Sequence, residues 1–371
     1  MSKKVIFMLI IVSTLTLFVY SMLNTNVNRE LRYFRYDSSG MKGLNVQKAF
    51  ENVLTRNRLI LAHTPREADL IFLERFSDQN VFTQIKALPS FSDKVLYTLV
   101  SVDQISSKSA LYDLMRRNST ESDLLSIFPR SFVTSNADDV RELETYVEAG
   151  NSIILKKNIQ QQKGCLIVDS IDKIDLREYT IAQELLQNPY TVSGRKINIR
   201  VYVMIQFDRL SNVKTYVYDD GFMYYTPKKY IANTIDKDRN ITTGYIDREV
   251  YRVNPLTFKD FKSTLRDKSA RKLSQNILRC FKKLFNSIMN DLQGIEETLA
   301  MRKFIIMGAD VAIDADLNVK LMEINKGPDL QPKDDRDGKL KKKMVCDAFE
   351  IQGFVNSRSV KKNDRNGFIL L

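Results

Sequence analysis

Residues 307–330 read MGADVAIDADLNVKLMEINKGPDL, and this stretch decides the fold. The apolar runs at 305–313 and 319–324 have the composition of buried strands, and the polar residues between them are typical of a turn. Because residues two apart on a strand share a face, Glu323 and Asn325 lie together, and Asp310 meets them if the runs pair as a hairpin. Such an oxygen-rich set suits Mg²⁺, although three polar residues at solvent-exposed strand ends would show the same spacing.

Basic residues upstream could hold phosphate. Lys156 ends the apolar run IILK and precedes a polar loop that closes with Lys163 and Gly164. Lys196 and Arg200 lie four apart in GRKINIR, hence on one strand face. Such cations can bind a polyanion, and a solvated basic face is the competing interpretation.

The remaining pattern alternates between strands and helices, which predicts an α/β (α+β) fold. We expect a small domain at residues 24–127, with short apolar runs at 59–61, 70–73 and 95–102. Further along, we expect a helix at 138–147, strands at 153–155, 165–168 and 197–207, a hairpin joining 214–218 to 222–225 around Asp219-Asp220-Gly221, a helical region at 258–303, and a basic helix near the C-terminus. The stripe Phe281, Leu284, Phe285, Ile288 and Leu292 is predicted to be core rather than a partner groove.

Residues 5–23 contain no charged side chain. As a helix this run would span about 28 Å, close to the thickness of a bilayer's hydrocarbon core. We expect a retained single-pass membrane anchor; a cleaved signal peptide and a buried soluble helix are the alternatives. Lys3 and Lys4 precede the run and three arginines follow it, a weak bias that favours a cytosolic body.

Composition narrows the chemistry of the whole chain. The 371 residues include 57 Lys+Arg and 45 Asp+Glu, which gives a net charge of +12, and they include one His and three Cys. His63 alone excludes multi-His zinc sites, and the scattered cysteines indicate no disulfide framework. The positive charge indicates an anionic partner, and no specific nucleic acid is expected because no nucleic-acid motif accompanies the charge.

An ordered series of segments resembles the tubulin–tyrosine ligase and tubulin ligase-like family, which has an ATP-grasp fold. The series lies within residues 128–353 and consists of FPRSF, IILKKNIQQQKGCLIV, AQELLQNPYTVSGRKINIRVYVMI, VYDDGFMYY, NITTGYI and LMEINKGPDL, followed by a lysine-rich helix. Each segment alone is weak, and their order is more specific. The resemblance implies an ATP-grasp domain at 128–355, which together with the patterns above divides the chain into an anchor at 1–23, an N-terminal α/β domain at 24–127, the ATP-grasp domain and a tail at 356–371.

The resemblance also implies roles for individual residues. Lys156, Lys163 and Gly164 would contact the phosphates of ATP; Gln183, Glu184 and Leu186 would border the adenine; Lys196 would reach the nucleotide; Arg200 would contact the γ-phosphate or acyl-phosphate; and Asp310, Glu323 and Asn325 would hold Mg²⁺. Lys196 and Arg200 are thereby the implied catalytic residues. The implied reaction is ATP-dependent ligation, through an acyl-phosphate, of an amino acid to the carboxylate of an acidic protein acceptor such as a tubulin-like tail.

Several positions depart from the family pattern. Asn198 stands where Asp is usual, Tyr224 where Arg is usual, Asn240 and Thr243 replace His and Asn, and Lys157 replaces Pro. The nucleotide and metal residues are thus better kept than the substrate residues. An altered substrate is one interpretation, and a weakened or inactive membrane-anchored scaffold that binds an acidic protein is the alternative.

Overall fold

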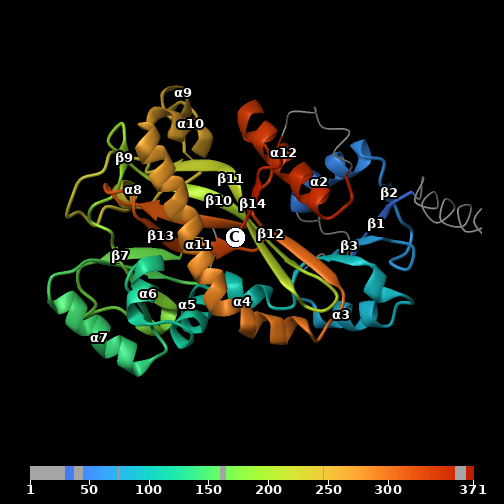
Figure 1. Cartoon of the computed structure of the whole chain (residues 1–371). Helices are drawn as coiled ribbons and strands as arrows, with labels where there is room; N and C mark the ends of the chain where they lie inside the picture. The colour runs from blue at the N-terminus through green and yellow to red at the C-terminus, as the bar shows by residue number, and fades with distance from the viewer. Residues whose placement is uncertain (1–29, 37–44, 74, 159–163, 245, 356–364) are drawn as a thin grey trace, which may run out of the picture.

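The structure is a computed structural model of the chain, shown in Figure 1. It describes residues 30–36, 45–73, 75–158, 164–244, 246–355 and 365–371. The helices are α2 (Asn45–Arg56), α3 (Gln79–Lys86), α4 (Val102–Ser106), α5 (Lys108–Arg117), α6 (Glu121–Ile127), α7 (Ala137–Glu148), α8 (Lys237–Asn240), α9 (Val250–Val253), α10 (Phe258–Thr264), α11 (Asp267–Glu296) and α12 (Asp335–Ile351). The strands are β1 (Arg32–Arg35), β2 (Ile60–Leu61), β3 (Leu70–Phe72), β4 (Val95–Tyr97), β5 (Ser131–Val133), β6 (Ile153–Lys156), β7 (Cys165–Val168), β8 (Ile181–Glu184), β9 (Thr191–Val192), β10 (Arg195–Phe207), β11 (Val213–Tyr225), β12 (Arg302–Ile313), β13 (Val319–Asn325) and β14 (Phe368–Leu370).

A large mixed sheet organises the molecule, in the order β14-β11-β10-β12-β4-β3-β1-β2. Strands β10, β11, β12 and β13 are antiparallel neighbours, whereas β4 joins β12 in parallel. β4 pairs with the first residues of β12 and β13 with the last ones, so both lie along the same edge of that strand. The N-terminal strands therefore extend the sheet that carries the β12–β13 hairpin, and the mixed α/β class is confirmed.

A smaller antiparallel sheet, β5-β8-β6-β7, lies beside the large one. Its apolar face packs against α7, where Phe132, Leu143 and Leu155 form a separate small core. Helix α7 follows the N-cap Asn136, whose side chain accepts hydrogen bonds from the backbone N–H groups of Asp138 and Asp139. In Figure 1 this unit, drawn in green, lies below the β7 and β13 labels.

Long helices cover the two faces of the large sheet. Side chains alternate along β12, so Lys303 and Phe304 point to opposite faces. Lys303 reaches Glu296 at the end of α11, while the Phe304 ring meets Phe349 of α12 at 5.8 Å. Helix α11 thus covers one face and α12 the other, as Figure 1 shows. The predicted stripe on α11 is buried, which confirms it as core.

One predicted hairpin is wrong. Residues 213–225 form a single strand, β11, without a turn at Asp219-Asp220-Gly221. The β10–β11 register shifts here between Val201 and Val203, and a Cβ at Gly221 would lie 2.3 Å from the Arg200 carbonyl oxygen. Asp220 Oδ1 accepts the N–H groups of Gly221 and Lys259. The turn-forming residues therefore make an irregularity inside a long strand and a contact to α10.

Two other segments differ from expectation. The apolar run 95–102 is typical of one buried strand, but it forms only the short strand β4 before the chain turns into α4; Thr98 Oγ1, just after β4, donates to the Phe76 carbonyl. The end of the expected tail forms β14, which pairs with β11 as an edge strand.

The predicted anchor at residues 5–23 lies outside the described residues. Among the helices of the described ranges, none combines the length and apolar character needed to cross a bilayer.

Candidate active site between the two sheets

The β12–β13 hairpin brings the predicted oxygen ligands together. Asp310 lies directly opposite Glu323 in the register, and Gly308 lies opposite Asn325. Asn325 Nδ2 donates to Glu323 Oε1 at 3.0 Å. We call Asp310, Glu323 and Asn325 the oxygen trio. Within the described part of the chain no three His, Cys, Asp or Glu residues gather as a metal cluster. The trio consists of two carboxylates and one amide.

Arg200 is held against this trio from the neighbouring strand. It pairs with Asp310 in the β10–β12 register, and its Nε and Nη2 donate to the two carboxylate oxygens at 2.5 and 3.1 Å. This bidentate geometry fixes the guanidinium. Gly308 provides the space for this side chain, because a Cβ at that position would lie 2.9 Å from both Cδ and Nη1 of Arg200.

Lys108 is a site residue that the sequence did not reveal. It begins α5, and its Nζ lies 3.0 Å from Glu323 Oε2, with 14% of its side chain exposed. A lysine in the segment SSKS carries no recognisable signal. Only the pairing of β4 with β12 brings α4 and α5 to the trio.

A cavity lies beside the trio, between the two sheets. It is lined by Ile154, Lys156, Cys165, Glu184, Leu185, Leu186, Lys196, Asn198, Asn240, Ile241, Thr242, Asp310, Ala312, Met322 and Glu323. Apolar side chains form one part of the wall, and cations and carboxylates form the other. Six predicted residues thus meet at one cavity: Lys156, Glu184, Leu186, Lys196, Asp310 and Glu323.

Two lysines in this cavity are buried. Lys156 is 5% exposed and Lys196 is 6% exposed. Lys156 donates to Gln183 Oε1, whereas Lys196 Nζ has no hydrogen-bond or ion-pair partner among the described residues. Burial lowers the pKa of Lys196 to about 8, and repulsion by Lys156 acts in the same direction. Burial also lowers the pKa of Lys156, although Glu323 opposes that effect.

The carboxylates of the trio differ in their pKa values. Burial raises the pKa of Asp310, even though Arg200 acts to lower it. Burial also acts to raise the pKa of Glu323, but the charges of Lys108 and Lys156 outweigh it, and the pKa falls to about 2. Glu323 is therefore charged at neutral pH, as a metal ligand must be.

The residues present fit a nucleotide and a divalent cation. Two buried ammonium groups that repel each other are stabilised by an anion, and phosphate oxygens supply one. Asn198 Oδ1 is buried without a partner among the described residues, an acceptor that a ligand hydroxyl could satisfy. Two carboxylates and an amide are hard oxygen ligands of the kind Mg²⁺ prefers.

Other predicted residues lie near this cavity in different ways. Gln183 lies behind Lys156 and holds it, with its amide donating to Ser131 Oγ at 2.8 Å. Gly164 lies against Lys157, where a Cβ would come within 2.7 Å of the lysine Cβ. Lys163 lies outside the described residues.

Tyr224 packs where a cation would be expected from the family pattern. Its ring lies 5.2 Å from the Arg200 guanidinium carbon and 5.4 Å from the Phe222 ring centroid. Arg248 approaches the same aromatic group, with its guanidinium 5.9 Å from Phe222 and 4.6 Å from Tyr251. Its Nη2 donates to Asp334 Oδ2 at 2.7 Å, and its Nη1 is buried without a partner among the described residues.

Comparison with known proteins identifies the family of the chain. A family model described as the tubulin-tyrosine ligase family matches residues 94–362. The match confirms the resemblance of the ordered segments and begins earlier than they do, so that it includes β4 and Lys108.

Individual relatives are more distant. Probable tubulin polyglutamylase TTLL9 of Rattus norvegicus is 26% identical over 211 residues, 55% of this chain and 44% of the rat protein. Probable alpha-tubulin polyglutamylase Ttll1 of Tetrahymena thermophila is 24% identical over 221 residues, 54% of this chain and 51% of its own length. Tubulin polyglutamylase TTLL7 of Homo sapiens is 22% identical over 255 residues, 61% of this chain and 28% of the human protein. The chain thus spans about half or less of each of these curated relatives.

Proposed function

Because the chain belongs to the tubulin-tyrosine ligase family, we propose that it is an ATP- and Mg²⁺-dependent ligase that joins an amino acid to a protein carboxylate. The observation that carries the proposal is the convergence of Lys156, Lys196, Asp310 and Glu323 on one cavity, with Asn325 bonded to Glu323 and Arg200 bonded to Asp310. Two sheets flanking this cavity are consistent with an ATP-grasp arrangement.

The residues divide the work as follows. Apolar side chains such as Leu186 and Met322 hold the base, and Lys156 and Lys196 bind the phosphates. Asp310, Glu323 and Asn325 would hold Mg²⁺, which when bound neutralises charge on the phosphate oxygens. Arg200 stabilises the negative charge of the phosphoryl group during transfer.

The reaction needs positioning more than acid–base catalysis. An acceptor carboxylate oxygen attacks the γ-phosphorus, the bond to ADP breaks, and an acyl-phosphate forms. The amine of the incoming amino acid attacks the acyl carbon, phosphate leaves, and the amine loses its proton. A polar hollow lined by Lys108, Asn325 and Lys326 adjoins the trio and supports entry of the acceptor from that side.

For the amino acid we propose glutamate. The matched relatives are named polyglutamylases. Arg248 lies beside the Phe222–Tyr224 pair with a buried Nη1 that has no hydrogen-bond partner in the described ranges, and it supplies a cation for a substrate carboxylate where Tyr224 cannot. Arginine suits this task because its planar fork matches a carboxylate.

The test is ADP release and acceptor mass with the full chain in mild detergent. The chain is given ATP, Mg²⁺, glutamate and an acidic acceptor peptide, with Glu323→Gln as the inactive control. We expect ADP release coupled to a peptide heavier by one amino-acid residue, and loss of both in the control. Failure of both proteins to bind nucleotide would reject the proposal.

Substitution of the usual Asp and Arg by Asn198 and Tyr224 favours a second candidate, a non-catalytic scaffold that binds an acidic protein. Nucleotide binding with Mg²⁺-dependent stabilisation, but no turnover on any acceptor, would support it over the ligase.

We further propose that residues 5–23 anchor the protein in a membrane with the ligase domain on the cytosolic side. Their length and lack of charge support this. We expect the full chain to resist alkaline extraction from membranes. We also expect the domain to be cleaved by protease in cells whose plasma membrane alone has been made permeable.

A further inference from the structure

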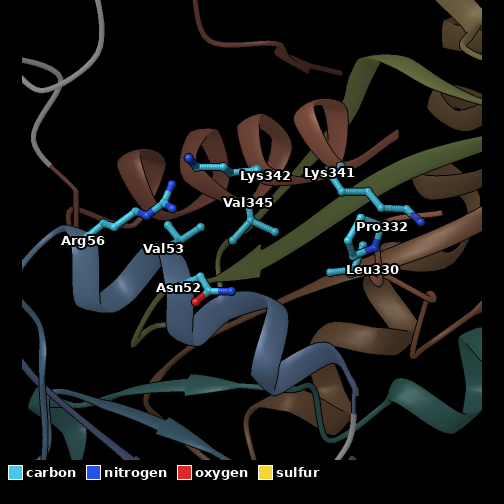
Figure 2. A pocket seen from close by; sticks show the side chains of 9 residues that line it. Asn52, Val53, Arg56, Leu330, Pro332, Lys341, Lys342 and Val345 are labelled. Carbon is cyan, nitrogen blue, oxygen red and sulfur yellow. The ribbon is translucent and has the colours of Figure 1, made fainter. Parts of the chain in front are cut away.

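A groove runs between α2 and α12, away from the nucleotide cavity (Figure 2). Val53, Val345 and Leu330 lie at its base, where they are 1–2% exposed and belong to the main core, and the exposed Pro332 also lines it. Arg56 of α2 and Lys342 of α12 line the same groove, and Figure 2 shows their side chains extending toward the same end of it. We call this the α2–α12 groove.

The positive charge of this groove is not neutralised by the described part of the protein. Arg56 and Lys342 are exposed, and neither has an ion-pair partner among the described residues. Their neighbours differ: Lys341 binds Asp337 and Lys343 binds Asp347. Burial raises the pKa of the nearby Cys346 thiol, and Lys342, Lys343 and Arg56 all act to lower it, so their charges converge there.

The groove connects with the catalytic hairpin through the chain. Leu330 and Pro332 lie in the segment that leads from Asn325 of the oxygen trio to α12. Gly338 keeps the groove open beside Pro332, because a Cβ at that position would lie 3.0 Å from the proline Cβ. The groove and the trio are therefore joined by a short stretch of sequence, residues 326–334.

We propose that the α2–α12 groove binds an acidic peptide segment of the acceptor protein. The carboxylates of the peptide pair with Arg56 and Lys342, and an apolar side chain of the peptide packs against the exposed Pro332. A concave surface suits an extended peptide better than a flat anionic bilayer. The inference rests on the proposed ligase function, since it names where that ligase holds its acceptor.

The experiment measures binding of a fluorescein-labelled peptide of glutamates with one leucine to the full chain in mild detergent, without nucleotide. We expect Arg56→Glu/Lys342→Glu to weaken binding by about tenfold or more. Arg56→Lys/Lys342→Arg should keep most of it. The matched control is Lys268→Glu/Arg271→Glu on α11, which changes the same charge at exposed residues and should alter affinity by less than about twofold. Binding should weaken as salt is added.

The outcomes separate this inference from the ligase proposal. Equal weakening in the groove variant and the α11 control would overturn the groove and leave the ligase untouched. If only the groove variant binds the peptide more weakly, and the unmodified chain never releases ADP, the result would support the groove and count against the ligase. If the unmodified chain does not bind the peptide, the proposal is overturned. If that chain instead prefers phosphatidylserine vesicles to neutral ones, and only the groove variant loses this preference, the surface is assigned to a membrane.

Discussion

Lys108 and Glu323 form an ion pair, Nζ to Oε2 at 3.0 Å, that joins the start of α5 to the hairpin of the oxygen trio. The pair places a fixed positive charge beside a group proposed to hold Mg²⁺. A fixed ammonium and a divalent cation compete for the same carboxylate, so the pair sets how tightly the metal is held.

Removal of this charge should therefore strengthen metal binding. We expect Lys108→Met to bind Mg²⁺ about tenfold more tightly, since the trio then carries more uncompensated negative charge. Calorimetric titration of the full chain measures this, with Lys283→Met as a control because Lys283 pairs with Asp123 instead. Weaker binding in Lys108→Met would show that the lysine orients Glu323 rather than competing for it.

Gly308 should be required for the position of Arg200. A methyl group there would displace the guanidinium from Asp310, because its Cδ and Nη1 lie 2.9 Å from the Cβ position. We expect Gly308→Ala to lower kcat by about 100-fold while nucleotide affinity changes little. The matched variant is Gly294→Ala on α11, where a Cβ meets nothing within 4 Å and activity should be unchanged. Full activity of Gly308→Ala would contradict the role of Arg200.

Nucleotide affinity should fall above pH 8. The pKa of Lys196 in the ligand-free protein is about 8, so its charge is present at pH 7 and is lost as the pH rises through that value. Phosphate binds the charged form, and affinity should decline toward about tenfold per pH unit until the pKa of the complex is reached. A binding curve for Lys196→Arg, which stays charged, should be flat over the same range. Identical pH profiles for the two proteins would remove Lys196 from the phosphate site.

Arg248 should affect the amino acid and not the nucleotide. If its free Nη1 binds the substrate carboxylate, Arg248→Ala raises the KM for glutamate by about tenfold or more. Nucleotide Kd should stay the same, and Arg248→Lys should recover only part of the loss. Steady-state kinetics at varied glutamate concentration provide the measurement. An unchanged KM would indicate that Arg248 serves only to bind Asp334.

A buried ion pair should matter for stability alone. Lys303 and Glu296 are fully buried, 3.2 Å apart, and Ser101 donates to the Glu296 carboxylate from both N and Oγ. Glu296→Gln leaves the ammonium without a countercharge, which should lower the free energy of unfolding by about 3–5 kcal/mol. The double variant Glu296→Leu/Lys303→Met should recover most of that loss, since an apolar pair needs no desolvation of charge. Urea denaturation followed by circular dichroism distinguishes these outcomes.

Much of the site follows from local pattern. Alternation along one strand predicts that Glu323 and Asn325 share a face, and a short turn predicts that Asp310 meets them; the register places Asp310 opposite Glu323. Lys156 and Lys196 were also predicted from strand position, and both line the cavity. These predictions succeed because each depends on residues close together in the chain or on one regular strand.

Failures occur where a residue's neighbours come from distant segments. Asp219-Asp220-Gly221 has turn chemistry, but pairing with β10 keeps the chain extended, because Gly221 allows the Arg200 carbonyl to approach. The C-terminal strand β14 carries little signal of its own and forms because β11 offers an open edge.

The sequence alone predicts several of the strands, the oxygen trio and the family, since these depend on periodicity and on the order of short segments. Only the tertiary structure decided that Lys108 reaches Glu323, that Arg248 approaches the Phe222–Tyr224 pair, and that Arg56 and Lys342 line one groove. The physical reason is that a charge acts over a few ångströms in space, and sequence spacing does not fix which distant charges come that close until the sheets are paired.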